Sequence, residues 1–175
     1  ITKIGITSIF VTHDQDEAIE VADEIIITNK GRVEQMGNPV EIYQNPKTPF
    51  VAQFIGQSTV IEDYGKLKGF KSHESLDKAV IRPEFVQLFK YGTSKQYESI
   101  LEDAYVEHLT FRGNEFEAEV NVQGIVVRVN YPLNKEPLSV GEKVQLLISK
   151  LYIFNESDTS LLVNEGLNTD NLFYI

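Results

Sequence analysis

Residues 8–37 read SIFVTHDQDEAIEVADEIIITNKGRVEQMG, and this stretch decides how the first part of the chain folds. It continues an apolar run that begins at Ile4, so we expect residues 4–11 to form a strand that is buried on both faces. Asp14 stands three residues before Glu17, a spacing typical of a helix whose first turn is capped by Asp14. Apolar residues at helical spacing then predict a short helix: Ala18, Val21, Ala22 and Ile25.

A hairpin is predicted directly after this helix. Residues 24–29 are rich in isoleucine and read as one strand, while residues 32–36 read as the returning strand. The Lys-Gly pair at residues 30–31 is the tight turn between them. A strand, a helix and a hairpin in this order are typical of the edge of an α/β domain.

Two short helices and a linker are expected next. Residues 38–58 contain an Asn-Pro pair at 38–39 and a Thr-Pro pair at 48–49, and each pair places a capping side chain before a proline at the first helical position. Gly56 closes the second helix. Residues 57–78 are polar and mixed in composition, which predicts a linker into a second domain.

The second domain is predicted to be all-β and to occupy residues 79–163. Every second residue of 115–122 is apolar, so these residues share one face of a strand. The Gln-Gly pair at 123–124 turns the chain into a partner strand over 125–130, and a further turn is expected at 140–143. Short strands at this spacing indicate a small barrel or sandwich.

The composition narrows the class of function. The net charge is −10, from 26 acidic against 16 basic residues, whereas nucleic-acid binders carry a basic footprint. The chain has no cysteine, and its 3 histidines lack the spacing of metal ligands, so we expect neither a disulfide nor a metal site. No apolar stretch is long enough for a membrane span, and no export leader is expected.

The motif around His13 resembles the C-terminal end of the ATP-binding domain of ABC transporters. The matching order is a strand, Thr-His-Asp-Gln, a helix, Ala-Asp, a second strand and Lys-Gly-Arg. The resemblance implies that His13 is the switch histidine, which reaches the γ-phosphate of ATP at a dimer interface. An imidazole there can hydrogen-bond the transferred phosphoryl group. Asp14 and Gln15 match the family pattern, and we treat them as possible contacts to the partner subunit.

The segments downstream resemble importer ATPases that carry an extra regulatory domain of the transport-associated OB (TOBE) type. Residues 37–46 (GNPVEIYQNP), 50–56 (FVAQFIG) and 81–84 (IRPE) carry this likeness. Within the group, the sequence is most similar to sulfate/thiosulfate importer ATPases, with molybdate, polyamine, iron and sugar importers as near relatives. The resemblance implies that the second domain is an OB-like barrel.

The expected fold is therefore mixed α+β and mainly β. We expect an α/β edge fragment at the end of an ABC ATPase domain, followed by an all-β OB-like small barrel with a regulatory role. The expected segments are the end of the nucleotide-binding domain at 1–37, a helical connector and linker at 38–78, the barrel at 79–163 and a C-terminal tail at 164–175.

The sequence departs from a complete ATPase. No Gly-x-x-x-x-Gly-Lys-Ser/Thr loop occurs in it, so nothing in the chain cradles the β- and γ-phosphates. Residues 138–142 (LSVGE) echo the family signature, but they are expected in a turn of the barrel and are rejected as that motif. The resemblance implies that ATP and Mg²⁺ serve the full-length protein, with their other ligands upstream of Ile1. We expect the chain alone to bind neither tightly and to hydrolyse no ATP.

The resemblance also implies partners and a location. The full-length protein is expected to form a homodimer with a second ATPase subunit, to bind membrane permease subunits and to work with an extracytoplasmic solute-binding protein. These contacts place it at the cytoplasmic face of the cell membrane, with no nucleic-acid partner. The expected substrate is sulfate, thiosulfate or a related oxyanion, and polyamine, iron and sugar remain alternatives.

A non-catalytic module that senses anions through its barrel is the alternative from another class of function. Four cations are candidates for such an oxyanion site, although scattered surface charges are the favoured interpretation: Arg82, Arg112, Arg128 and Lys150. The two remaining histidines, His73 and His108, are expected to be surface or packing residues.

Overall fold

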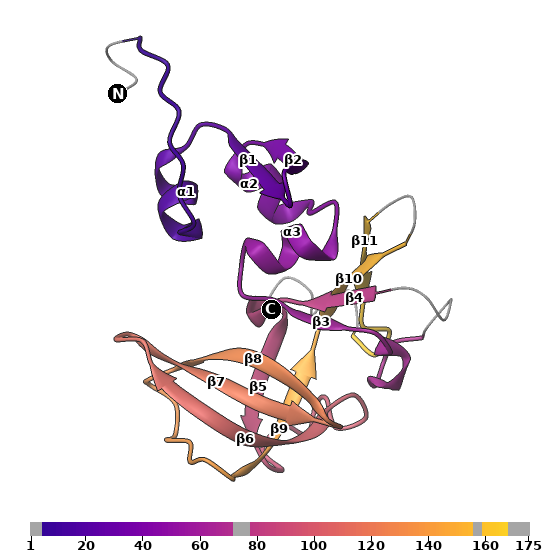
Figure 1. Cartoon of the computed structure of the whole chain (residues 1–175). Coiled ribbons are helices and arrows are strands. Elements are labelled where there is room, and N and C mark those ends of the chain that lie inside the picture. Colours follow the sequence, from indigo (N-terminus) through magenta and orange to yellow (C-terminus); the bar gives the residue numbers. More distant parts are fainter. Residues whose placement is uncertain (1–4, 72–77, 156–158, 168–175) are drawn as a thin grey trace.

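The computed structural model describes residues 5–71, 78–155 and 159–167. Short helices and a hairpin gather at one end of the molecule, and a curled sheet forms the other end (Figure 1). A second, smaller sheet lies between them. The described residues are mainly β-strand, and the expected mixed α+β fold with an OB-like curled sheet is confirmed.

The strand expected at residues 4–11 is not formed in the described part of that segment. Residues 6–12 have no regular secondary structure, and their apolar side chains are exposed, from 63% for Phe10 to 93% for Ile9. A strand buried on both faces needs neighbouring strands to pair its backbone and layers to cover its faces. The described residues supply neither to this segment, so the prediction of a buried strand is wrong for this chain; Ile4 lies outside the described residues.

The predicted helix forms as α1, Gln15–Val21. Asp14 caps it, because its Oδ1 accepts hydrogen bonds from the amides of Asp16 at 3.0 Å and Glu17 at 3.1 Å. The Glu17 carboxylate accepts from the Thr12 hydroxyl at 2.9 Å, so the cap is an Asp cap and not a reciprocal capping box. Of the expected apolar stripe, Ala18, Ala22 and Ile25 pack inward, while Val21 is 59% exposed.

The predicted hairpin and the two predicted helices are also present. Strands β1, Ile25–Asn29, and β2, Arg32–Gly37, pair antiparallel across a turn in which Lys30 and Gly31 have φ values of 49° and 78°. Helices α2, Pro39–Gln44, and α3, Pro49–Phe54, begin after the caps Asn38 and Thr48. A small core joins these elements: Ile25, Ile27, Ile42, Val51 and Ile55.

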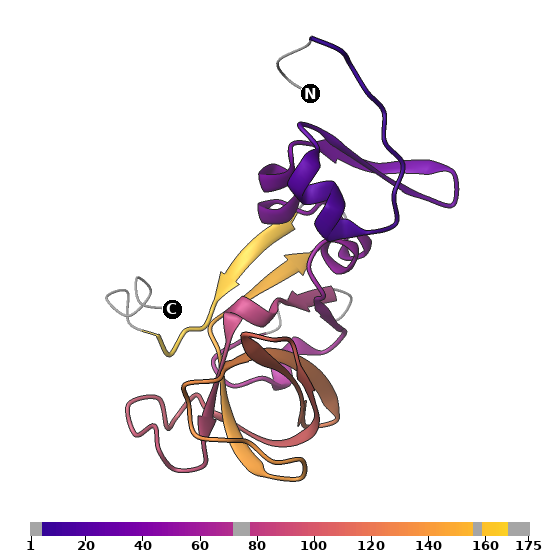
Figure 2. The ribbon, with the colours of Figure 1, turned by 90° about the vertical axis from the view of Figure 1, so that its left-hand side faces the viewer.

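Nine antiparallel strands form the two sheets of the barrel region within the described residues. The curled sheet has the order β5-β9-β6-β7-β8, and the smaller sheet has the order β11-β10-β4-β3. Figure 2 shows how strongly the first sheet curls. The strands are β3 Thr59–Ile61, β4 Lys78–Ile81, β5 Val86–Lys90, β6 Glu102–Phe111, β7 Glu115–Val122, β8 Ile125–Pro132, β9 Lys143–Ile148, β10 Lys150–Phe154 and β11 Thr159–Val163. Two short 3₁₀ helices accompany them, η1 Tyr64–Lys66 and η2 Pro83–Phe85.

The alternation in residues 115–122 produces the expected face. Ala118, Val120 and Val122 are fully buried in the core of the curled sheet. The register between β7 and β8 closes with Val122 opposite Ile125, so the Gln-Gly pair between them is a two-residue turn. The main core is built from side chains of both sheets, which joins them into one hydrophobic unit.

Two segments take more part in the fold than their composition indicates. The expected linker contributes β3, which pairs with β4, and it buries Tyr64, Leu67 and Phe70 in the main core. The expected C-terminal tail begins with Asn164, which is only 1% exposed, and Leu167 packs into a satellite core. Polar residues surround these buried residues in the sequence, so the average composition of each segment does not reveal that part of it is buried.

Candidate functional site

His13 lies immediately before the capping residue of α1. Its side chain is exposed, and among the described residues none donates a hydrogen bond to it or accepts one from it. The backbone around it is held locally, because the amide of Asp14 donates to the Thr12 hydroxyl at 3.0 Å while the Asp14 carboxylate caps the helix. The local structure therefore fixes the backbone at His13 and leaves the imidazole available to a partner.

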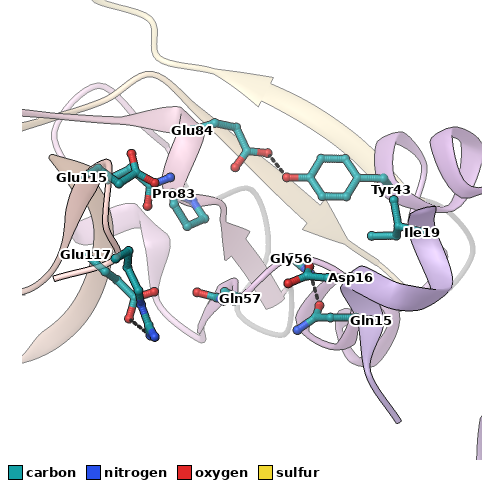
Figure 3. Close-up of a pocket in the computed structure, with 12 residues that line it drawn as sticks. Gln15, Asp16, Ile19, Tyr43, Gly56, Gln57, Pro83, Glu84, Glu115 and Glu117 are labelled. Atoms are coloured by element: carbon teal, nitrogen blue, oxygen red, sulfur yellow. Dashed lines mark hydrogen bonds and ion pairs between the residues drawn. The ribbon is translucent and has the colours of Figure 1, made fainter. Parts of the chain in front are cut away.

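Gln15 connects this region to the connector helices. Its Oε1 accepts a hydrogen bond of 2.9 Å from the amide of Gly56, 41 residues along the chain (Figure 3). Asp14 is likewise used inside the chain as the helix cap. Both residues thus have an internal role, and a contact to a partner subunit remains a proposal for them.

A cavity of about 300 Å³ opens beside this hydrogen bond. It is lined by α1, by the connector and by the barrel, so three parts of the fold meet there (Figure 3). The single lining cation, Arg112, is paired with Glu117 at 3.0 Å. The acidic lining residues outnumber it and disfavour an anionic ligand: Asp16, Glu84, Glu115 and Glu117.

Tyr43 and Glu84 close one side of the cavity. The Tyr43 hydroxyl donates to Glu84 Oε1 at 2.6 Å, linking α2 to η2 (Figure 3). Burial, followed by the hydrogen bond to the Glu84 carboxylate, raises the pKa of Tyr43 to about 12 against the opposing effect of Arg82. Tyr43 is therefore a neutral hydrogen-bond donor throughout the physiological range of pH.

Arg82 is not a surface cation. It is fully buried, and its guanidinium donates to the carbonyl of Ile55 at 2.9 Å and to the carbonyl of Tyr43 at 2.7 Å. The guanidinium carbon also lies 3.7 Å from the centre of the Tyr43 ring and 5.5 Å from the centre of the Tyr152 ring. Its Nε is buried and has no hydrogen-bond partner among the described residues. The guanidinium of Arg82 is thus used in contacts within the chain.

The other three candidate cations lie apart from one another. Arg112 is at the cavity, and Arg128 lines a different hollow and pairs with Glu119 at 3.4 Å. The Lys150 ammonium lies 5.9 Å from the centre of the Phe85 ring. The structure does not bring the four expected oxyanion ligands together, because two pair with carboxylates and Arg82 is buried.

Of the two remaining histidines, the structure describes only His108. His108 is exposed on β6, and His73 lies outside the described residues. Among the residues that the structure describes, no three His, Asp or Glu side chains are grouped to hold a metal ion. Sequence reasoning missed the roles of Tyr43, Glu84 and Gly56; the only signal was the Arg-Pro-Glu motif at 82–84, which it noted without a function.

Comparison with known proteins identifies the family. No protein-family model matches the chain. The chain is 39% identical over 137 residues to the spermidine/putrescine import ATP-binding protein PotA of Clostridioides difficile, which covers 70% of this chain and 38% of that protein. PotA of Clostridium acetobutylicum is 35% identical over 160 residues, covering 82% of this chain and 42% of the relative. The chain belongs to the ATP-binding proteins of ABC importers.

Sulfate importers are among the relatives in this family of importer ATP-binding proteins. The sulfate/thiosulfate import ATP-binding protein CysA of Acinetobacter baylyi is 64% identical over 56 residues, which is 32% of this chain and 16% of that protein. CysA of Gloeobacter violaceus is 40% identical over 118 residues, or 67% of this chain. The chain spans less than half the length of the curated relatives that it matches.

Importers work at membranes, so the described helices were compared with the requirements of a membrane-spanning helix. None of the helices described here combines the length and the apolar character of a membrane span. The longest of them, α1, has 7 residues.

Proposed function

We propose that this chain is the C-terminal part of the ATP-hydrolysing subunit of an ABC importer, and that His13 contacts the γ-phosphate of bound ATP. The observation that carries the proposal is the exposed imidazole of His13, placed by a capped helix and used by no other described residue. The importer relatives, named as ATP-binding proteins, support it.

The chemistry proposed for His13 is electrostatic. An imidazole N–H at this position donates a hydrogen bond to an oxygen of the transferred phosphoryl group, where negative charge develops. The chain contributes no phosphate-binding loop, and the Asp14 carboxylate is engaged in capping α1. ATP and Mg²⁺ are therefore proposed to be held by the rest of a complete subunit, with His13 as the contact from this chain.

The partners follow from the same proposal. A second ATPase subunit would complete the nucleotide site as a homodimer, and permease subunits would bind the pair at the cytoplasmic face of the membrane. An extracytoplasmic solute-binding protein would deliver the substrate. Asp14 and Gln15 are the residues of this chain proposed nearest to the partner ATPase subunit.

Two substrates of opposite charge compete within this proposal. Sulfate or thiosulfate is favoured by the 64% identity to CysA over 56 residues. A polyamine is favoured by the PotA matches, which extend over 70% and 82% of the chain. Uptake of radiolabelled sulfate and of radiolabelled spermidine by cells that depend on the complete importer separates them, because only the true substrate accumulates in an ATP-dependent manner.

The test of the function is ATP hydrolysis by the complete importer with His13→Ala. We expect kcat to fall by about 100-fold to 1,000-fold, the usual cost of removing one donor to a developing charge, with little change in KM for ATP. His108→Ala is the matched control, because His108 is exposed on β6 and its loss should leave the rate unchanged. A His13→Ala importer with the wild-type rate would contradict the proposed role of His13.

A further inference from the structure

One buried side chain joins the barrel to the helical end of the molecule. Arg82, between β4 and η2, is among the largest fully buried side chains of the described residues. Both of its hydrogen bonds leave the barrel: one ends on the carbonyl of Tyr43 near the end of α2, and the other on the carbonyl of Ile55 at the end of α3. Arg82 therefore fixes two helix ends at once.

These two carbonyls suit a guanidinium. The last carbonyls of a helix have no partner within the helix, so they need an outside donor when they are buried. The planar fork of arginine supplies two N–H donors in fixed directions, which a lysine cannot reproduce. The ring of Tyr43 lies against the guanidinium, and the Tyr152 hydroxyl on β10 donates to the Gln44 carbonyl at 2.9 Å. The ends of the connector helices are thus held by Arg82, directly after β4, and by Tyr152 on β10.

Gly56 extends this connection to α1. A Cβ at Gly56 would lie 2.3 Å from Arg82 Nη1 and 2.9 Å from the Tyr43 ring, so the backbone of Gly56 packs directly on the buried arginine. Its φ of +121° also favours glycine. The amide of Gly56 is the group that donates to Gln15, the first residue of α1. Arg82, Gly56 and Gln15 therefore form one continuous line of contact.

The helix at the end of this line has little else to hold it. α1 is 7 residues long and has no fully buried residue, and helices this short are unstable in isolation. Its remaining support among the described residues is the Asp14 cap and the partial packing of Ala18 and Ala22 against the small helical core. We propose that Arg82 is a positioning residue, which through Gly56 and Gln15 sets the place of α1 and of His13 directly before it.

The inference concerns how the barrel and the nucleotide end are connected, and its functional meaning rests on the proposed role of His13. Without the arginine fork, the ends of α2 and α3 move relative to β4, and Gly56 no longer presents its amide to Gln15. Without Gln15, only the last step of the line is lost. The loss of Gln15 should therefore affect α1 alone, whereas the loss of Arg82 should affect α1 together with α2 and α3. We call this a nested pattern.

Hydrogen exchange of the 175-residue chain, read by mass spectrometry, tests this nesting. Gln15→Ala should speed exchange in α1 by about fivefold, the effect of losing one ordinary hydrogen bond, and leave α2, α3 and the β7–β8 hairpin unchanged. Arg82→Lys should speed exchange in α1, α2 and α3 together, again without change in β7–β8. Arg128→Lys is the matched control, because Arg128 is part-exposed on β8 and pairs only with Glu119.

The double variant supplies the decisive comparison. If the line of contact is real, adding Gln15→Ala to Arg82→Lys should not speed exchange in α1 beyond the effect of Arg82→Lys alone. Unchanged α1 exchange in Gln15→Ala would overturn the inference, even if Arg82→Lys fails to fold. Faster exchange in all segments of Arg82→Lys would also overturn it, since Arg82 would then be a general stabiliser of the fold.

The same variants separate this inference from the proposed function. Exchange is measured without ATP, so the nested pattern stands or falls independently of catalysis by His13. In the complete importer, Arg82→Lys should lower kcat with KM for ATP unchanged, as expected for a displaced phosphate contact. An importer insensitive to His13→Ala refutes the proposed function alone, whereas flat exchange in α1 refutes the positioning role alone.

Discussion

Replacing Asn164 with alanine is expected to be among the most damaging single changes in the barrel region. Its side chain is 1% exposed and makes three hydrogen bonds with backbone groups. Nδ2 donates to the carbonyl of Lys68 at 3.0 Å and to the carbonyl of Ile148 at 2.9 Å, while Oδ1 accepts from the amide of Gly166 at 3.0 Å. This one residue thus joins the end of the chain to β9 and to the segment before β4.

The expected cost follows from the groups left without partners. Each buried polar group that loses its hydrogen bond costs about 1–3 kcal/mol, and the Lys68 carbonyl is near enough to the surface for water to replace part of that loss. We expect Asn164→Ala to lower the free energy of unfolding by about 3 kcal/mol. For a chain of this size, that corresponds to a fall in Tm of roughly 6–12 °C.

Urea denaturation followed by far-UV circular dichroism measures this cost, because the chain has no tryptophan for fluorescence. Asn164→Asp keeps the volume and the acceptor but points a second acceptor at two carbonyls, so it should cost at least as much as alanine. Asn130→Ala is the control, since Asn130 is exposed on β8 and its loss should change stability by less than about 0.5 kcal/mol. A cost below about 1 kcal/mol for Asn164→Ala would refute the reasoning.

Two further changes test the barrel. The hydrogen bond from Lys90, assisted by the amide of Ser139, lowers the pKa of Glu142 below its ordinary 4.5, so this carboxylate stabilises the fold above that pH and loses its contribution as the pH falls. The urea midpoint of Glu142→Gln should therefore fall less between pH 5 and pH 3 than that of the wild type. Equal falls in the urea midpoint of the two proteins would contradict this. Glu62→Gln is the control, because Glu62 is exposed. Gly124 has a φ of +89° in the β7–β8 turn with open space around it, so Gly124→Ala should cost about 1–2 kcal/mol from backbone conformation alone in the same denaturation assay. A change below about 0.5 kcal/mol would show that the turn rearranges without strain.

Local rules predicted much of the fold from the sequence. The Asp14 cap depends only on a side chain and the amides of the next few residues, so the local sequence is enough to predict it. The same holds for the turn at Lys30 and Gly31, where glycine tolerates a positive φ. The alternation in β7 was equally informative, because one face of that strand is buried and the other is not.

The failures share a different cause, which is the identity of distant neighbours. Residues 6–11 have the composition of a buried strand, but burial needs covering layers that the described chain does not give them. Arg82 looked like a surface cation because its charge is visible in the sequence, while the helix-end carbonyls that bury it are 27 and 39 residues away. The burial of Asn164, in the expected C-terminal tail, likewise depends on a partner elsewhere, since Ile148 is 16 residues away.

The residues of the candidate site show the same difference between local and distant interactions. His13 was singled out by its motif, and in the structure its exposed side chain lies directly before the capping residue of α1. The contact of Gln15 with Gly56 spans 41 residues and has no local signature. The motif therefore supplied the residue for which a partner contact is proposed, while its contacts with the rest of the chain became visible only with the tertiary structure.

The hydrogen bond between Tyr152 and Gln44 has a consequence for how the protein is made. Its two residues are 108 positions apart, so the donor is synthesised long after the helix that it holds. At about 5–20 residues per second, a ribosome needs roughly 5–20 s to add that stretch. The hairpin of β1 and β2 and its small core with α2 and α3 can form during this interval, but the contact of α2 with β10 must wait. A nascent chain is therefore most exposed to proteases and chaperones before residue 152 emerges.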